Sequence, residues 1–143
     1  ITFNYGLILA WISIQDGISM IPIVFYIGAI FWTLGYDTIY GYQDIVDDEI
    51  IGVKSSSIKF KNNPKLLISI SYLIFLTSLI IIGILMNFEI YYFMFLFITL
   101  IHLFFLQIKN LNVKSPVDCL IKFKSNNFLG LIIFINILIG KLI

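Results

Sequence analysis

The sequence predicts an all-α integral membrane protein, a polytopic helical bundle with about five transmembrane helices, and three observations support this prediction. Of the 143 residues, 60% are hydrophobic and only 12% are charged, whereas about 25% of the residues in soluble domains are charged. Mean hydropathy is +1.03. The apolar residues form separate runs, several of which approach the ~20 residues that a helix needs to cross a bilayer. The lipid bilayer is therefore the first expected partner, and we expect no nucleic-acid partner.

Five apolar segments give the expected helices in order. They are residues 1–14, 18–40, 66–86, 90–106 and 128–143. The first segment is short for a span, so we interpret it as the end of a helix that begins upstream, and we expect the chain to be the C-terminal part of a longer protein. Turns are expected at 15–17 and 87–89, and Pro64 breaks the connection before the third segment. A polar connection over 109–127, with a short interfacial helix from Ser115, precedes the last segment.

The lysines indicate how these segments cross the membrane. All nine basic residues are lysine, and two connections hold most of them: Lys54, Lys59, Lys61 and Lys65 in one, and Lys109, Lys114, Lys122 and Lys124 in the other. With alternating spans, both connections lie on the same side. The positive-inside rule assigns that side to the cytoplasm or, in a mitochondrion, to the matrix.

The stretch 35–56 leaves the second segment on that same side and holds five of the eight acidic residues. If it continues as a helix, the side chains at i, i+3, i+7, i+10 and i+11 share one face. They belong to Asp37, Tyr40, Asp44, Asp47 and Asp48. Neighbouring carboxylates repel one another unless a cation lies between them. A Mg²⁺ ion held by one or two carboxylates, with phosphate oxygens completing its coordination shell, is the natural candidate.

The alternative interpretation of these acids is a solvated helix end. Helix ends on the cytoplasmic side are usually rich in lysine rather than in acid. Asp37 also lies closer to the bilayer than the other carboxylates, where an acidic side chain is costly and is typical of a functional site. We therefore favour a functional role. A transport pathway is disfavoured, because the acids gather at one surface instead of crossing the bilayer.

A few other residues have chemical potential. Lys54 and Ser55 follow Gly52, which permits a tight turn that brings Lys54 back toward the carboxylates. There its ammonium group would neutralise a departing phosphate, although a membrane-anchoring lysine has the same signature. His102 is typical of a hydrogen-bonded residue between helices, and the single cysteine, Cys119, excludes an internal disulfide. The aromatic residues, 17% of the chain, either line a pocket that shields a carbocation or face lipid.

Two motifs resemble a known family. Residues 36–48, followed by 52–55, resemble the second aspartate-rich motif of the UbiA superfamily of membrane prenyltransferases. Within that superfamily they are most similar to the 4-hydroxybenzoate polyprenyltransferases of ubiquinone biosynthesis. Residues 118–120, 123–127 and Gly130 resemble the family's last connection before its final helix. The spans between the motifs have compatible lengths, so the resemblance covers the whole chain.

The resemblance implies that residues 1–143 are the C-terminal portion of a bundle of nine transmembrane helices around a central cavity. Two aspartate-rich motifs would bind Mg²⁺ and the diphosphate of a polyprenyl donor. Departure of the diphosphate would leave an allylic cation, which attacks the ring of 4-hydroxybenzoate or a related aromatic acceptor. The D-x-x-x-D pair of the second motif falls on Asp44 and Asp48. The membrane would be the inner membrane of a bacterium or of a mitochondrion.

The residues and the resemblance together lead us to expect three groups of site residues. The expected catalytic residues are Asp37, Tyr40, Asp44 and Asp48. The expected metal ligands are Asp44, Asp47 and Asp48. The residues expected to bind the diphosphate are Lys54 and Ser55.

The sequence departs from the family pattern in one respect. The family's first aspartate-rich motif, N-D-x-x-D-x-x-x-D, does not occur in these 143 residues, and there is no arginine to bind the carboxylate of the acceptor. Asp44 and Asp48 alone would bind Mg²⁺ weakly and would not hold a diphosphate from both sides. The alternative to an enzyme is therefore an inactive fragment of a split or decaying gene. A partner chain that carries the N-terminal half would reconcile the two.

Overall fold

A computed structural model describes residues 4–15, 17 and 19–142, and every regular element within them is helical. The elements are α1 (Tyr5–Ile14), α2 (Met20–Gly41), α3 (Ile45–Ile51), α4 (Ser56–Lys59), α5 (Pro64–Leu85), α6 (Ile90–Leu100), the π-helix η2 (Ile101–Lys109) and α7 (Pro116–Leu142). Four helical segments are long and apolar enough to cross a membrane: α2, α5, α6 continued by η2, and α7. α1 is a shorter apolar helix. The prediction of an all-α, polytopic membrane protein is confirmed.

Parts of the expected segments lie outside the described residues. These parts are residues 1–3 and Ile18 at the beginnings of the first two segments, Asp16 of the first turn, and Ile143 at the end of the last segment.

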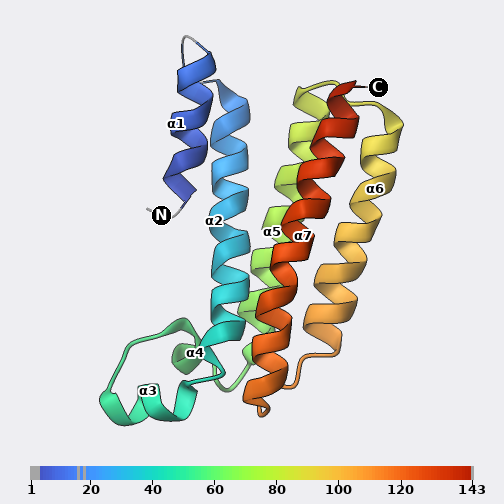
Figure 1. Ribbon diagram of the computed structural model, residues 1–143. Coiled ribbons are helices and arrows are strands. Elements are labelled where there is room, and N and C mark those ends of the chain that lie inside the picture. The colour runs from blue at the N-terminus through green and yellow to red at the C-terminus, as the bar shows by residue number, and fades with distance from the viewer. Residues whose placement is uncertain (1–3, 16, 18, 143) are drawn as a thin grey trace.

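The long helices run alternately up and down, side by side, as Figure 1 shows. α2 packs against α5, α7 packs against both α2 and α6, and α1 pairs with α2 at one edge of the bundle. The short helices α3 and α4 lie where α2 finishes, and we call this the α3 end of the bundle. The connection between η2 and α7 lies at the same end. There Lys65 Nζ donates to the backbone oxygen of Lys109 at 3.1 Å, so the two lysine-rich connections meet.

Small residues let α2 and α5 approach each other closely. A Cβ atom at Gly28 would collide with the side chain of Ser78, and one at Gly35 would collide with the ring of Tyr72. Helices in lipid associate through such close packing, because lipid tails remove the hydrophobic force between them. The α2–α5 interface therefore holds in place the helix that carries Asp37.

The last helix differs from the expectation. We expect a polar connection over 109–127 and a span only from residue 128, but α7 is one continuous helix from Pro116 to Leu142. Its start agrees with the sequence, since Ser115 Oγ accepts a hydrogen bond from the backbone N–H of Asp118 at 3.3 Å and proline suits a first helical turn. Lysines in its early turns lower the local hydropathy, but lysine is a good helix former. The prediction of a separate short helix from Ser115 is therefore wrong.

The fourth span ends in an unexpected conformation. α6 continues directly into η2, a π-helix of nine residues, whereas π-helical segments are rare and mostly limited to single turns. The buried side chains of η2 are those of His102, Leu103 and Gln107. Hydropathy gives the length of this span but carries no information about its helical type.

α3 presents an apolar side to its surroundings. Val46 is 67% exposed and Ile50 is 80% exposed. At 100° per residue these two side chains lie opposite those of Asp44 and Asp48. Ile51, which is 75% exposed, lies on the same side as these carboxylates. The helix therefore exposes hydrocarbon on both of its sides.

Candidate functional site

The acidic stretch is not one helix. α2 ends at Gly41, the chain turns through residues 42–44, and α3 begins at Ile45. The predicted single helical face is therefore wrong. Asp37 and Tyr40 lie on α2, whereas Asp47 and Asp48 lie on α3 and Asp44 is the N-cap residue of α3.

The break is explained by the burial of Tyr42, which is only 3% exposed. Its hydroxyl donates to the backbone oxygen of Phe60 at 3.3 Å and ties the turn to the segment after α4. Burial, with a smaller contribution from Cys119, raises the pKa of Tyr42 to about 12, so the hydroxyl stays protonated at neutral pH. α4 also approaches the end of α2 closely, because a Cβ atom at Gly41 would lie 2.7 Å from Ser57 Oγ. The chain leaves the α2 axis to make these contacts.

Asp44 and Asp48 lie one helical turn apart. Asp44 precedes α3, and its backbone oxygen accepts a hydrogen bond from the N–H of Asp48 at 2.9 Å, so both side chains leave the same side. The Asp44 carboxylate also accepts from Gln43 Nε2 at 3.4 Å. Among residues 4–15, 17 and 19–142, no group of three His, Cys, Asp or Glu side chains is placed to hold a metal ion. The structure thus does not bring the three expected ligands, Asp44, Asp47 and Asp48, together around one metal position.

A carboxylate pair of this kind fits Mg²⁺ that is held jointly with phosphate oxygens. Mg²⁺ commonly takes one or two protein carboxylates and leaves its other positions to water and phosphate. The ion pair of α3 joins Glu49 to Lys61, at 2.6 Å. Within the described part of the chain, neither Asp44 nor Asp48 forms an ion pair with a lysine.

The loop between α3 and α4, which holds Lys54 and Ser55, is joined to α2 through Ser56. Gly52 ends α3 with φ +79°, a left-handed conformation that favours glycine. Beyond it, Ser56 Oγ lies 2.8 Å from Thr38 Oγ1 of α2. The loop is thus fastened to the helix that carries Asp37.

Lys54 and Ser55 line a cavity of about 440 Å³ at this loop, together with Lys59. Ser55 Oγ caps α4 by accepting from the N–H of Ile58 at 3.4 Å and lies 2.8 Å from Ser57 Oγ. Lys54 is exposed. Val53, Ser56 and Ile58 complete the lining, so the two lysines and Ser55 lie beside a largely apolar cavity.

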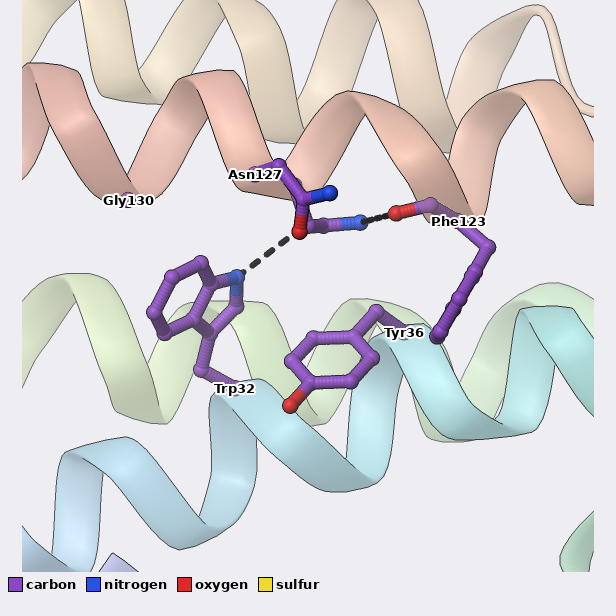
Figure 2. A pocket seen from close by; sticks show the side chains of 6 residues that line it. Trp32, Tyr36, Phe123, Asn127 and Gly130 are labelled. Atoms are coloured by element: carbon purple, nitrogen blue, oxygen red, sulfur yellow. Dashed lines mark hydrogen bonds between the residues drawn. The ribbon is translucent and has the colours of Figure 1, made fainter.

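A pocket of about 410 Å³ lies between α2 and α7 (Figure 2). It is lined by Trp32, Tyr36, Phe123, Asn126, Asn127 and Gly130. Figure 2 shows the rings of Trp32 and Tyr36 reaching from α2 toward α7, which supplies Phe123 on the far side. The faces of aromatic rings carry negative potential that attracts a cation, so the pocket suits an apolar ligand that develops positive charge.

Aromatic contacts connect this pocket to the α3 end. The ring centroid of Phe123 lies 5.7 Å from that of Tyr36 and 4.8 Å from that of Tyr40. Tyr36 and Tyr40 are one turn apart on α2, and Asp37 lies between them in the sequence. The structure therefore brings Tyr40 to the edge of the pocket, and Asp37 is exposed nearby on the same helix.

Sequence reasoning missed a buried polar network behind the pocket. Trp32 Nε1 and Gln107 Nε2 both donate to Asn126 Oδ1, each at 3.0 Å, and the hydroxyl of Tyr72 donates to Gln107 Oε1. His102 Nδ1 lies 3.4 Å from Gln107 Nε2, so the contact of His102 is to its own helix rather than the expected neighbour. The sequence signal that could have indicated this network is the presence of amide side chains in apolar segments, because buried amides need hydrogen-bond partners.

Two further cavities continue from the pocket along α2, away from the α3 end. The first, of about 350 Å³, shares Trp32 and Gly130 with the pocket. The second, of about 280 Å³, shares Leu7, Phe25 and Ile137 with the first. Apolar and aromatic side chains dominate the lining of both. The three cavities thus follow one another along α2.

The fold and the site define a class: a polytopic helical membrane protein with a carboxylate pair, a lysine-lined cavity and an aromatic pocket at one end of its bundle. The chain belongs to the UbiA prenyltransferase family, whose sequence pattern matches residues 1–137.

The relatives of this chain include transferases that act on 4-hydroxybenzoate. The mitochondrial 4-hydroxybenzoate polyprenyltransferase of Aedes aegypti is 37% identical over 144 residues, which cover 99% of this chain and 32% of the relative. The human protein of the same name is 37% identical over 143 residues, which cover 99% of this chain and 38% of the human protein. The 4-hydroxybenzoate geranyltransferase 1 of Lithospermum erythrorhizon is 40% identical over 127 residues, covering 87% and 41%. The chain thus spans 32% to 41% of the length of these relatives. No solved structure matches it.

Proposed function

We propose that this chain takes part in the Mg²⁺-dependent transfer of a polyprenyl group from polyprenyl diphosphate to the ring of 4-hydroxybenzoate or a related aromatic acceptor, a step of ubiquinone biosynthesis. In this proposal it supplies the second aspartate-rich motif. The observation that carries the proposal is the row of cavities along α2, which begins at Tyr36, next to Asp37 in the sequence, and continues between apolar side chains. A ligand with an anionic head and a long hydrocarbon tail fits that row. The names of the relatives support the same chemistry.

The diphosphate would bind at the α3 end. Asp44 and Asp48 would hold Mg²⁺, whose charge would offset that of the diphosphate. Asp47 would add negative charge close to the ion without being part of a three-ligand set. The ammonium group of Lys54 would stabilise the charge that develops on the departing diphosphate, and Ser55 would line the same cavity.

The first isoprene unit would occupy the pocket between α2 and α7. When the bond from its terminal carbon to the diphosphate oxygen breaks, the electron pair leaves with the diphosphate and an allylic cation remains. The rings of Tyr36, Tyr40 and Phe123 would stabilise this cation. A ring carbon of the acceptor, ortho to its hydroxyl, then supplies the electron pair for the new carbon–carbon bond and loses its proton. Asp37 is our candidate to receive that proton.

The remaining isoprene units would follow the two apolar cavities. Their path along α2 runs from Tyr36 to Ile21, which lines the last cavity. Fifteen residues of helix correspond to about 22 Å. This length accommodates several isoprene units in contact with apolar side chains.

The orientation and the partners of the chain are part of the proposal. The lysine-rich connections favour placing the α3 end on the cytoplasmic side of a bacterial inner membrane or the matrix side of a mitochondrial one. The first aspartate-rich motif would come from the part of the relatives' length that this chain does not span, or from a separate partner chain. An inactive fragment is the alternative.

Prenyl transfer from polyprenyl diphosphate to 4-hydroxybenzoate, measured in membranes that contain the protein and saturating Mg²⁺, tests the proposal. Asp44→Asn is expected to lose nearly all activity, because a neutral amide replaces a metal ligand. Glu49→Gln is the matched control on the same helix, and we expect it to retain activity because Glu49 pairs with Lys61. Near-normal turnover of Asp44→Asn would count against Asp44 as a ligand.

A second comparison distinguishes the enzyme from an inactive fragment. The chain is assayed alone and together with a co-expressed chain that carries N-D-x-x-D-x-x-x-D. Activity in either case supports the proposal, whereas its absence in both supports the inactive fragment.

A further inference from the structure

The π-helix η2 brings two polar side chains of the fourth span together. The hydrogen bonds of a π-helix join residues five apart, and His102 and Gln107 have that spacing. Gln107 Nε2 lies 3.4 Å from His102 Nδ1. Gln107 is 0% exposed, so the wide turn delivers an amide into the interior of the bundle rather than to its surface.

The amide of Gln107 joins three other helices. Its Oε1 accepts a hydrogen bond from the hydroxyl of Tyr72 on α5. Its Nε2 donates to Asn126 Oδ1 at 3.0 Å and to Ser125 Oγ at 3.4 Å, both on α7. Through Asn126 it reaches Trp32 on α2. A buried amide with this many partners is costly to remove, because each partner is left unsatisfied.

Asn126 transmits this contact to the wall of the pocket. Its Nδ2 donates to the backbone oxygens of Lys122 and Phe123, each at 3.1 Å, one of which Figure 2 shows. Its Oδ1 is therefore turned toward Gln107 and toward the indole N–H of Trp32. The Trp32 ring is held from its other side by Phe75, with ring centroids 5.1 Å apart and planes 3° apart.

We propose that Gln107 is a positioning residue for the pocket between α2 and α7. It orients Asn126, and through Asn126 it fixes the indole of Trp32 and the spacing of the two helices around the reactive end of the donor. The inference rests on the proposed function for the identity of the ligand. It goes beyond that function, because Gln107 does not line the pocket and belongs to neither motif.

The first test compares Gln107→Leu with Asn136→Leu in the protein assembled with all chains that it needs for activity. Asn136 is a buried amide of α7 that donates to the backbone oxygen of Tyr92 at 3.2 Å, about 15 Å along the helix from Asn126. Both variants lose a buried amide, so both lower the melting temperature. We expect only Gln107→Leu to raise the KM for the polyprenyl diphosphate, by about tenfold, as the loss of one hydrogen bond to a positioned group predicts.

A second readout does not depend on activity. This chain has two tryptophans, so in a Trp11→Phe background its emission, measured without any partner chain, reports on Trp32 alone. We expect Gln107→Leu to shift the emission maximum, because the indole N–H loses an oriented acceptor, and Asn136→Leu to leave it in place. If the unaltered protein proves inactive, the proposed function fails, and this readout still decides whether Gln107 positions Trp32.

Gln107→Glu provides a rescue with its own signature. A protonated carboxyl accepts from Tyr72 and donates to Asn126 as the amide does, whereas a carboxylate cannot donate. We expect a near-normal KM at low pH that rises as the introduced carboxyl ionises, on top of any pH dependence of the unaltered protein, to which the amide of Gln107 does not contribute. Equal KM values in Gln107→Leu and Asn136→Leu, or an unmoved Trp32 emission, would overturn the proposal. If Gln107→Leu does not fold, the pH dependence of Gln107→Glu decides alone.

Discussion

The ring of Tyr40 lies 4.8 Å from the ring of Phe123, centroid to centroid, with their planes at 45°. This contact joins the end of α2, which leads into the acidic motif, to the α7 wall of the pocket. The pocket proposed for the allylic cation is therefore linked to the end of α2 from which the chain continues to Asp44, in the proposed diphosphate site.

Tyr40 is expected to act through its ring. Tyr40→Leu removes the contact with Phe123 and a face that attracts a cation, so we expect a several-fold fall in kcat/KM for the polyprenyl donor, in line with the ~0.5–1.5 kcal/mol of an aromatic pair. Tyr40→Phe keeps the ring and is expected to retain most activity. An equal loss in both variants would assign the role to the hydroxyl instead.

Asp44 and Asp48 are expected to act as a unit. If both carboxylates hold one Mg²⁺ ion, either Asp44→Asn or Asp48→Asn should remove nearly all activity, and the double variant should be little worse than each single one. Titration with Mg²⁺ measures this directly, and Glu49→Gln is the control for loss of one charge on α3. Strictly multiplicative losses would indicate that the two carboxylates serve separate steps.

Gly35→Ala is expected to destabilise the bundle. The added methyl group would collide with the ring of Tyr72, and overpacking of this kind costs about 1–3 kcal/mol. Thermal unfolding in detergent measures the effect. Gly6→Ala is the matched control, because a Cβ atom at Gly6 meets nothing within 4 Å. A Gly35→Ala protein as stable as Gly6→Ala would show that α2 and α5 separate without cost.

Tyr42 predicts a loss of stability at high pH. Its folded-state pKa of about 12 exceeds the ordinary value of 10.0, so its contribution is complete below pH 10 and is lost as the pH rises toward 12. We expect Tyr42→Phe to be less stable at neutral pH, since the hydrogen bond to Phe60 is absent, and less sensitive to pH over that window. The difference in melting temperature between the two proteins from pH 8 to 12 is the measurement. A constant difference would contradict the assignment.

The sequence predicted the membrane helices well, because hydropathy is a strong and local signal. The expected spans 18–40, 66–86 and 90–106 agree closely with the observed helices. The sequence did not predict that the helix carrying the acidic motif ends at Gly41. The spacing of Asp37, Tyr40 and Asp44 is compatible with a continuous helix, and only the burial of Tyr42 against α4 ends it.

The polar network shows a different limit of prediction. Gln107 and Asn126 are nineteen residues apart, and their hydrogen bond depends on the π-helical turn of η2 and on α7 being continuous through its lysines. Neither feature has a local sequence signature. The residue types of the acidic motif identified its chemistry, whereas the supports of the pocket became visible only in three dimensions.

The exposed hydrocarbon of α3 has a consequence for how a donor arrives. A short helix with exposed Val46, Ile50 and Ile51 among its carboxylates would lie at the boundary between hydrocarbon and water. Its carboxylates would then be held at the depth of lipid head groups. A lipid diphosphate would reach them by lateral diffusion in two dimensions, with its tail never leaving the bilayer, so the cost of extracting that tail into water would not enter the rate.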